Sequence, residues 1–220
     1  MPTQIQKTIT AYQFNELSDK AKDKVRDWFS QDVDLDYVVD DFKTQMKALD
    51  ILVDDVQYRG FNSQGDGASW TGTVDIIPFL ERLAPDHTLF TKGVVLVELI
   101  REGWVAEFAT VNRASYFYNH SGTMGMDNIG YYLEAEEEAD RKIKGGILQG
   151  ANVRELFGSL GGEYFLEEVG TAILEDAKAQ ADKLYKDLES AYEWEISDEH
   201  IAECAEINEW LFDENGKIIN

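Results

Sequence analysis

Apolar and polar positions along the chain follow two different periods, and these periods predict its main elements. In residues 18–49 the apolar side chains recur every three or four positions. This spacing predicts two amphipathic helices, one beginning after Ser18 and one over residues 36–49. Residues 54–76 instead alternate between apolar and polar side chains around a glycine-rich centre, a pattern typical of two strands joined by a loop. The helical period returns at residues 163–195, where we expect one long helix.

Shorter patterns predict the remaining elements. The expected strands are a first strand at Ile5–Tyr12, then Val94–Arg101 and Trp104–Thr110 joined by a turn at Glu102-Gly103, with further strand character at Ser115–Tyr118. The expected helices are a short helix at Ile76–Leu83, a charged helix at Glu134–Lys144 and a helix after Ser197. A turn at Asn215-Gly216 closes the chain. Together they indicate an α+β fold, with a central antiparallel sheet over about residues 54–127 packed by N-terminal and long C-terminal helices. We expect a single domain over residues 1–220, in which residues 134–220 form a mainly helical acidic region.

The net charge of the chain limits the kinds of molecule that it can bind. The chain holds 43 acidic and 20 basic residues, for a net charge of −23, and residues 134–220 alone hold 23 acidic and 8 basic residues. A field of this sign repels nucleic acid and anionic membranes and attracts basic protein surfaces. We therefore expect no direct nucleic-acid binding, no membrane binding and a basic protein partner, itself able to bind nucleic acid.

Acidic positions of the long C-terminal helix form the candidate surface for such a partner. They are Glu167, Glu168, Glu175, Asp176, Asp182, Asp187 and Glu189. Carboxylates in rows along a helix can occupy a basic groove that otherwise holds phosphates. The structural alternative is a solvated face on an acidic protein.

Two polar segments in the middle of the chain form a candidate ligand site. The loop Asn62–Gly67 presents Ser63, Gln64 and Asp66 beside two glycines, and the segment Arg113–Met126 contributes Arg113, Tyr116 and His120. If the two segments meet, an aspartate and a histidine could act as acid and base on a small ligand, or bind a metal ion. The structural alternatives are a turn in which Asp66 bonds its own backbone and an ordinary hydrogen-bonded histidine.

No cofactor, dedicated metal site or catalytic residue is indicated. The one cysteine, Cys204, excludes an intramolecular disulfide and a cysteine zinc cluster, and its place on an apolar helix stripe predicts core packing. No apolar run approaches the roughly 20 residues of a membrane span, and the N-terminus lacks the features of a signal peptide. We therefore expect the cytoplasm as the location of the protein. Its oligomeric state stays open.

Four segments of the chain resemble one family, and one of them is the N-terminal ELSDKAKDKVRDWF, which fits the usual opening of that family. YRGFNSQGDGASWTG resembles the SGFxSQGDGAxFxG signature of uncharacterised proteins encoded by bacteriophages, plasmids and bacteria, while RASYFYNHSGTM and the C-terminal segment from Lys183 to Lys217 resemble its other blocks. The chain departs at Tyr116, where many relatives have histidine, and at Thr123, where cysteine is common. The resemblance implies that a mobile element such as a bacteriophage or plasmid encodes the protein. If a phage encodes it, the expected location is the cytoplasm of the host cell. Some relatives are loosely labelled antitoxins.

These observations lead to three functional hypotheses. The first is a phage-type, non-enzymatic acidic protein that inhibits a host nucleic-acid-binding or defence protein, by nucleic-acid mimicry. The second is a protein that binds or hydrolyses a small nucleotide signal through the SQGDG loop and the Tyr/His segment. The third is an antitoxin that masks a basic toxin.

Overall fold

A computed structural model describes residues 8–61, 63, 65–114, 118–132 and 141–219. The fold is α+β, as the sequence predicts, with helices flanking a four-stranded antiparallel sheet. The chain divides into two compact units: the terminal unit holds the residues up to Val38 together with those from Asp187 onward, and the central unit holds Val39–Lys186. The single domain stays a prediction.

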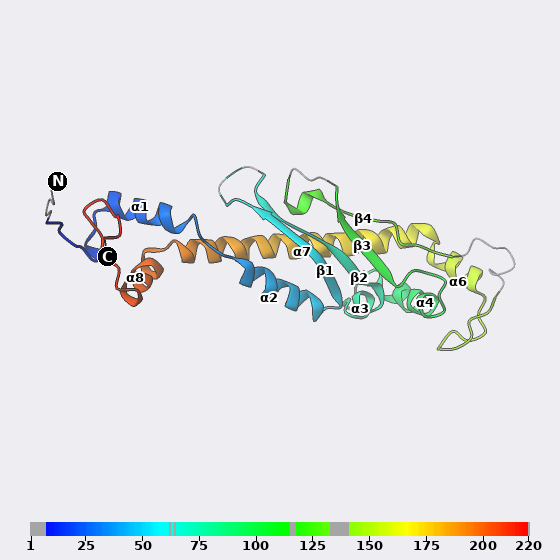
Figure 1. The fold of residues 1–220 in the computed structure, drawn as a ribbon. Helices are drawn as coiled ribbons and strands as arrows, with labels where there is room; N and C mark the ends of the chain where they lie inside the picture. The colour runs from blue at the N-terminus through cyan, green and yellow to red at the C-terminus, as the bar shows by residue number, and fades with distance from the viewer. Residues whose placement is uncertain (1–7, 62, 64, 115–117, 133–140, 220) are drawn as a thin grey trace, which may run out of the picture. The chain divides into compact units, whose positions relative to one another are not determined.

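The sheet of the central unit has the strand order β1-β2-β3-β4 (Figure 1). Its strands are β1 (Ile51–Arg59), β2 (Gly67–Asp75), β3 (Phe108–Arg113) and β4 (Met124–Met126). The β1–β2 hairpin is the one that the alternating pattern predicts, with Val56 opposite Trp70 and an irregularity between Val53 and Asp55. β3 pairs with β2, and β4 pairs with β3, both antiparallel.

Helix α7 (Glu163–Glu195) is the long helix that the sequence predicts. Its buried positions recur at helical spacing and include Phe165, Val169, Ile173, Ala177 and Leu184. The fully buried Trp70 of β2 donates its indole N–H to the main-chain oxygen of Ala177 at 3.1 Å. Helix α7 therefore packs against the sheet as the second layer of the core.

Shorter helices complete the central unit. They are α2 (Asp36–Lys47), which begins in the terminal unit, α3 (Ile76–Glu81), α4 (Phe90–Arg101) and α6 (Val153–Leu160). The side chain of Asp75 caps α3 by accepting the N–H of Ile77 at 3.0 Å, and Asn152 caps α6 by accepting the N–H of Glu155 at 3.0 Å. None of the helices in this or any other described part of the chain combines the length and apolarity that a membrane span requires.

The other unit joins both ends of the chain. Helices α1 (Asp19–Phe29) and α8 (Asp198–Ile207) share a core with Phe14, Leu17 and Phe212. Both helices begin where the sequence predicts, after Ser18 and Ser197, and the Ser197 hydroxyl accepts the N–H of His200 at 3.2 Å.

The closing turn of the chain also forms as predicted. The Asp213 carboxylate accepts the N–H groups of Asn215 and Lys217, and a single antiparallel bridge joins Phe212 to Ile218. These two hydrogen bonds also hold the pKa of the Asp213 carboxyl below its ordinary value.

Two strand predictions are wrong. Val94–Arg101 belongs to helix α4, and Glu102-Gly103 ends that helix instead of turning a hairpin. Apolar residues fall on most sides of the run because Leu96–Ile100 are all buried, and a largely buried helix and a buried strand give similar sequence patterns. Of the predicted Trp104–Thr110 strand, only the end from Phe108 belongs to β3.

Other boundaries also differ from the expectations. In the expected first strand, Tyr12 forms a single bridge to Phe212, the preceding residues from Thr8 are unpaired, and residues 5–7 lie outside the described part. Residues 141–144 of the expected charged helix are not helical, and the rest of it lies outside the described residues. Residues 115–117 are likewise undescribed, and Tyr118 is not in a strand.

Trp70→Ala should destabilise the central unit by about 3–5 kcal/mol, because it leaves a large cavity and leaves the Ala177 carbonyl without the indole donor. Urea unfolding followed by circular dichroism measures the change. Tyr164→Ala is the control: it removes an aromatic ring 69% exposed on α7, the helix that Trp70 contacts, and should cost less than about 1 kcal/mol. Equal losses for the two variants would contradict the role given to Trp70.

Candidate functional site

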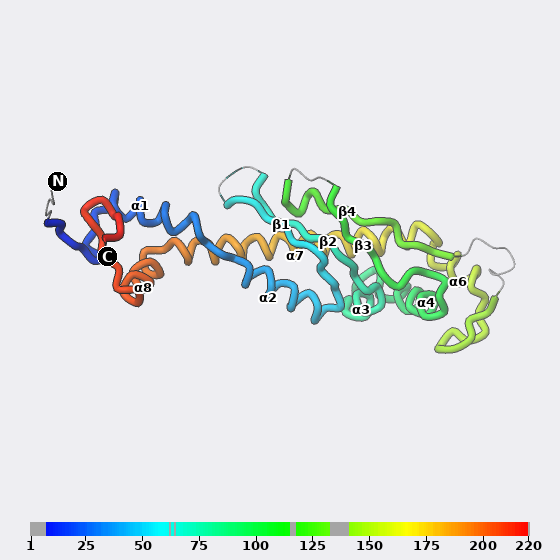
Figure 2. The backbone as a smooth tube through the Cα atoms, in the orientation of Figure 1, coloured from blue at the N-terminus to red at the C-terminus, as the bar shows by residue number. Residues whose placement is uncertain are grey.

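The two polar segments of the candidate ligand site do lie side by side. In an antiparallel sheet the β1–β2 and β3–β4 connections emerge at the same end, and both are found there (Figure 2). A Cβ atom on Gly67 would lie 2.5 Å from the Cβ of His120, so only glycine allows this approach. A Cβ atom on Gly65 would lie 3.4 Å from the ring of Tyr118, in ordinary van der Waals contact.

Asp66 nevertheless closes its own loop. Its carboxylate accepts the N–H of Ser63 at 2.5 Å, while its N–H donates to the Ser63 carbonyl at 3.1 Å. A Cβ atom on Gly60 would meet the same carboxylate at 2.5 Å. These contacts are those of the structural alternative, a turn stabilised by its aspartate.

Arg113 and His120 also make structural contacts. Arg113 of β3 donates to the Asp55 carboxylate of β1 at 2.6 Å, spanning the intervening strand β2. The His120 carbonyl accepts the Thr123 hydroxyl at 2.8 Å, and its ring lies against Gly122. Gln64 and Tyr116, the remaining candidates, lie outside the described residues. Within the described part of the chain, no three histidine, cysteine or acidic side chains gather as a metal site would require.

The seven candidate carboxylates of α7 differ in their surroundings. Glu168, Glu175 and Asp182 are seven residues apart, so they share one face of the helix, and all three are exposed. Glu167 is exposed as well, whereas Asp176 is half-buried and pairs with Arg82 at 3.5 Å. Asp187 and Glu189 belong to the terminal unit. Among the described residues, Asp176 is the only one of the seven with an ion-pair partner.

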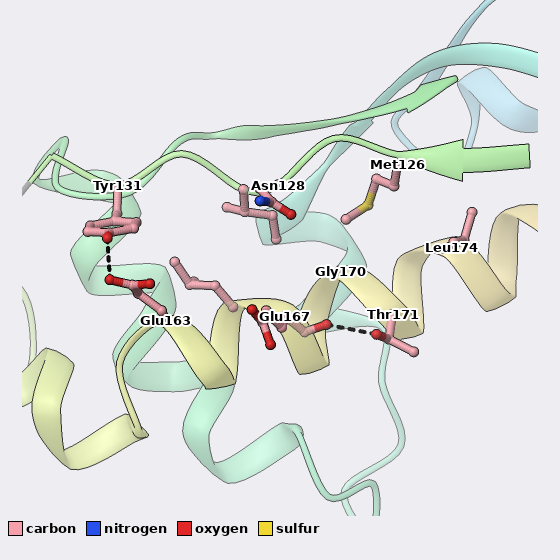
Figure 3. Close-up of a pocket in the computed structure, with 10 residues that line it drawn as sticks. Met126, Asn128, Tyr131, Glu163, Glu167, Gly170, Thr171 and Leu174 are labelled. Atoms are coloured by element: carbon pink, nitrogen blue, oxygen red, sulfur yellow. Dashed lines mark hydrogen bonds between the residues drawn. The ribbon is translucent and has the colours of Figure 1, made fainter. Parts of the chain in front are cut away.

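A cleft of about 370 Å³ adjoins the first turns of α7 (Figure 3). Glu163 and Glu167 line it beside the apolar side chains of Met126 and Leu166. Tyr131, stacked on Phe157, donates its hydroxyl to the Glu163 carboxylate. The absence of a side chain at Gly170 lets Met126 pack directly on α7. The acidic helix thus offers a shaped cleft as well as exposed carboxylates, and Glu163 was not among the residues that the sequence singled out.

The terminal unit contains a second cleft that sequence reasoning also missed. It measures about 560 Å³, and aromatic and acidic side chains dominate its lining. Trp28, Phe29 and Trp210 form one cluster with ring centroids 5.2–6.0 Å apart in edge-to-face arrangements. Tyr37 adds a fourth ring, and burial, followed by the Glu195 charge, raises the pKa of its hydroxyl.

His200 and Cys204 lie in this second cleft and contact one another, so the half-buried Cys204 is not packed in the core as its place on the helix stripe predicts. The Cys204 Sγ and the Glu195 Oε2 approach the same imidazole nitrogen, His200 Nε2, at 3.5 and 3.0 Å. A catalytic relay uses the two ring nitrogens for different partners, so this arrangement is not a nucleophile–base–acid chain. Burial raises the pKa of the Cys204 thiol, and the Glu195 and Glu203 charges raise it further, which keeps the sulfur protonated. The spacing of four residues between His200 and Cys204 on a helix was the one sequence signal for this contact.

The chain belongs to the family described as Domain of unknown function (DUF8835), whose model matches residues 35–198. No curated protein and no solved structure matches the chain.

Alkylation of Cys204 by iodoacetamide tests its protonation. We expect a rate several-fold slower than that of a free cysteine at neutral pH, with a midpoint at a higher pH than for an ordinary thiol. Because the Glu195 charge contributes to the rise, Glu195→Gln should move the midpoint to lower pH, whereas Glu193→Gln on the same helix should not. Cys204 is the one cysteine of the chain, so the adduct is measured directly by mass spectrometry. A midpoint below that of free cysteine would refute a protonated thiol.

Proposed function

We propose that this protein is a phage-type, non-enzymatic inhibitor that binds a basic, nucleic-acid-binding host protein through the acidic face of α7. The observation that carries the proposal is the row Glu168, Glu175 and Asp182, exposed on one face and without ion-pair partners among the described residues. Lys178 and Lys186 lie three or four residues from Glu175 and Asp182 on the same side of α7 and offset part of this charge, but neither forms an ion pair with the row within the described part. The row therefore leaves three exposed carboxylates open to direct pairing with a basic partner.

The spacing of the row defines what it can imitate. Seven residues of α-helix rise by roughly 10.5 Å, whereas duplex DNA carries one charge per roughly 1.7 Å of its axis. The helix thus offers the sign and the straight alignment of phosphates at a lower density. Competition for a basic groove follows from such a surface, and it requires no phosphate-by-phosphate match.

Contacts at the SQGDG loop favour this proposal over the small-ligand hypothesis. Asp66 holds its own turn and Arg113 is bound to Asp55, so two of the groups that a ligand would need already have structural roles. An antitoxin that masks a basic toxin would use the same acidic face and differ only in the identity of the partner.

Affinity capture from bacterial lysate compares the protein with the triple variant Glu168→Gln/Glu175→Gln/Asp182→Asn. Wild type should retain basic proteins that compete for DNA, with retention falling as salt is raised, and the triple variant should retain about tenfold less. Quantitative mass spectrometry measures the captured proteins.

The matched control is Asp54→Asn/Asp86→Asn/Glu107→Gln, which removes three exposed carboxylates of the same unit that lie outside α7. The control should capture like wild type. If the triple variant and wild type capture equally, or if capture is insensitive to salt, the acidic face of α7 is not the binding surface.

A further inference from the structure

The second cleft combines aromatic faces with carboxylates in a way that suits one kind of ligand. Its rings come from the end of α1, from Tyr37 and from Trp210, and its carboxylates are Asp32, Asp34 and Glu195. Trp28 and Tyr37 are 43% and 55% exposed, so large aromatic side chains face the solvent at this place. All of the lining residues belong to the terminal unit.

The carboxylates of the cleft are only partly occupied by the protein itself. Asp34 accepts the N–H of Asp36 at 2.8 Å through one oxygen, and Glu195 pairs with His200 at 3.0 Å. Asp32 is exposed, and the described residues supply no cation to it. No lysine or arginine lines the cleft, so its charge complements a cation.

We propose that this cleft binds the guanidinium group of an arginine side chain presented by the basic partner. A guanidinium is flat and weakly hydrated, so it can stack on Trp28 or Trp210 while its edge donates to Asp32 and Glu195. A lysine ammonium is more strongly hydrated and lacks a flat face, so it fits this combination less well. The proposal rests on the proposed function only for the source of the arginine.

N-acetyl-arginine amide is the probe, and N-acetyl-lysine amide is its comparison at equal ionic strength. The indole N–H signals of the five tryptophans report binding in two-dimensional NMR spectra. We expect saturable shifts of the Trp28 and Trp210 signals with the arginine probe and at least about fivefold weaker binding of the lysine probe. An absence of saturable shifts, or equal binding of both probes, would overturn the proposal.

Two double variants separate the cleft from the general charge of the protein. Asp32→Asn/Glu195→Gln should weaken binding of the arginine probe by about tenfold. Glu193→Gln/Glu214→Gln removes two exposed carboxylates of the same unit outside the cleft and should leave binding within about twofold. Equal weakening by the two variants would show that the probe responds to net charge, which overturns the site.

The outcome is distinguishable from that of the capture experiment. The arginine probe needs no partner protein, so its response tests the cleft alone. Loss of the response with unchanged lysate capture removes the cleft and leaves the acidic face of α7 in place. A retained response with failed capture keeps the cleft and removes the acidic face of α7 as the binding surface.

Discussion

The hydrogen bond from the Trp70 indole to the Ala177 carbonyl marks the contact on which the central unit depends. It joins the middle of strand β2 to the middle of α7, and both side chains are buried. β2 lies between β1 and β3, so a helix held against β2 covers the inner strands of the sheet. Since an indole N–H without a partner would be costly in this core, the bond fixes where α7 lies along the strand as well as which face it buries.

Burial of one face of α7 determines what the opposite face can do. The buried residues from Phe165 to Leu184 keep that face apolar, and the side chains seven residues apart at Glu168, Glu175 and Asp182 are left in solvent. A rigid helix aligns these charges at no further entropic cost. The packing that stabilises the fold is therefore also the packing that arranges the acidic face.

Sequence reasoning succeeded where the determinants are local. The helix starts after Ser18 and Ser197 follow from the local preference of serine for the N-cap position, where only the Ser197 hydroxyl accepts a main-chain N–H, and the β1–β2 hairpin depends on alternation around a glycine-rich loop. It failed at Val94–Arg101, because burial on most sides obscures the periodicity that separates helix from strand. The nearness of Gly67 and His120 was foreseen as a possibility, but the use of Asp66 to close its own loop follows from geometry that composition alone could not decide.

Sequence reasoning could not have found the second cleft, because its lining comes from distant parts of the chain. That origin also bears on the role of its carboxylates. Asp32 follows α1 and Glu195 ends α7, so the two residues are far apart in the sequence although they line the same cleft. A carboxylate that only keeps an acidic protein soluble can lie anywhere on the surface. Three that border one aromatic cleft, with no lysine or arginine in its lining, instead define a place with a shape and a sign. Such a combination discriminates between cations, whereas charge alone attracts all of them.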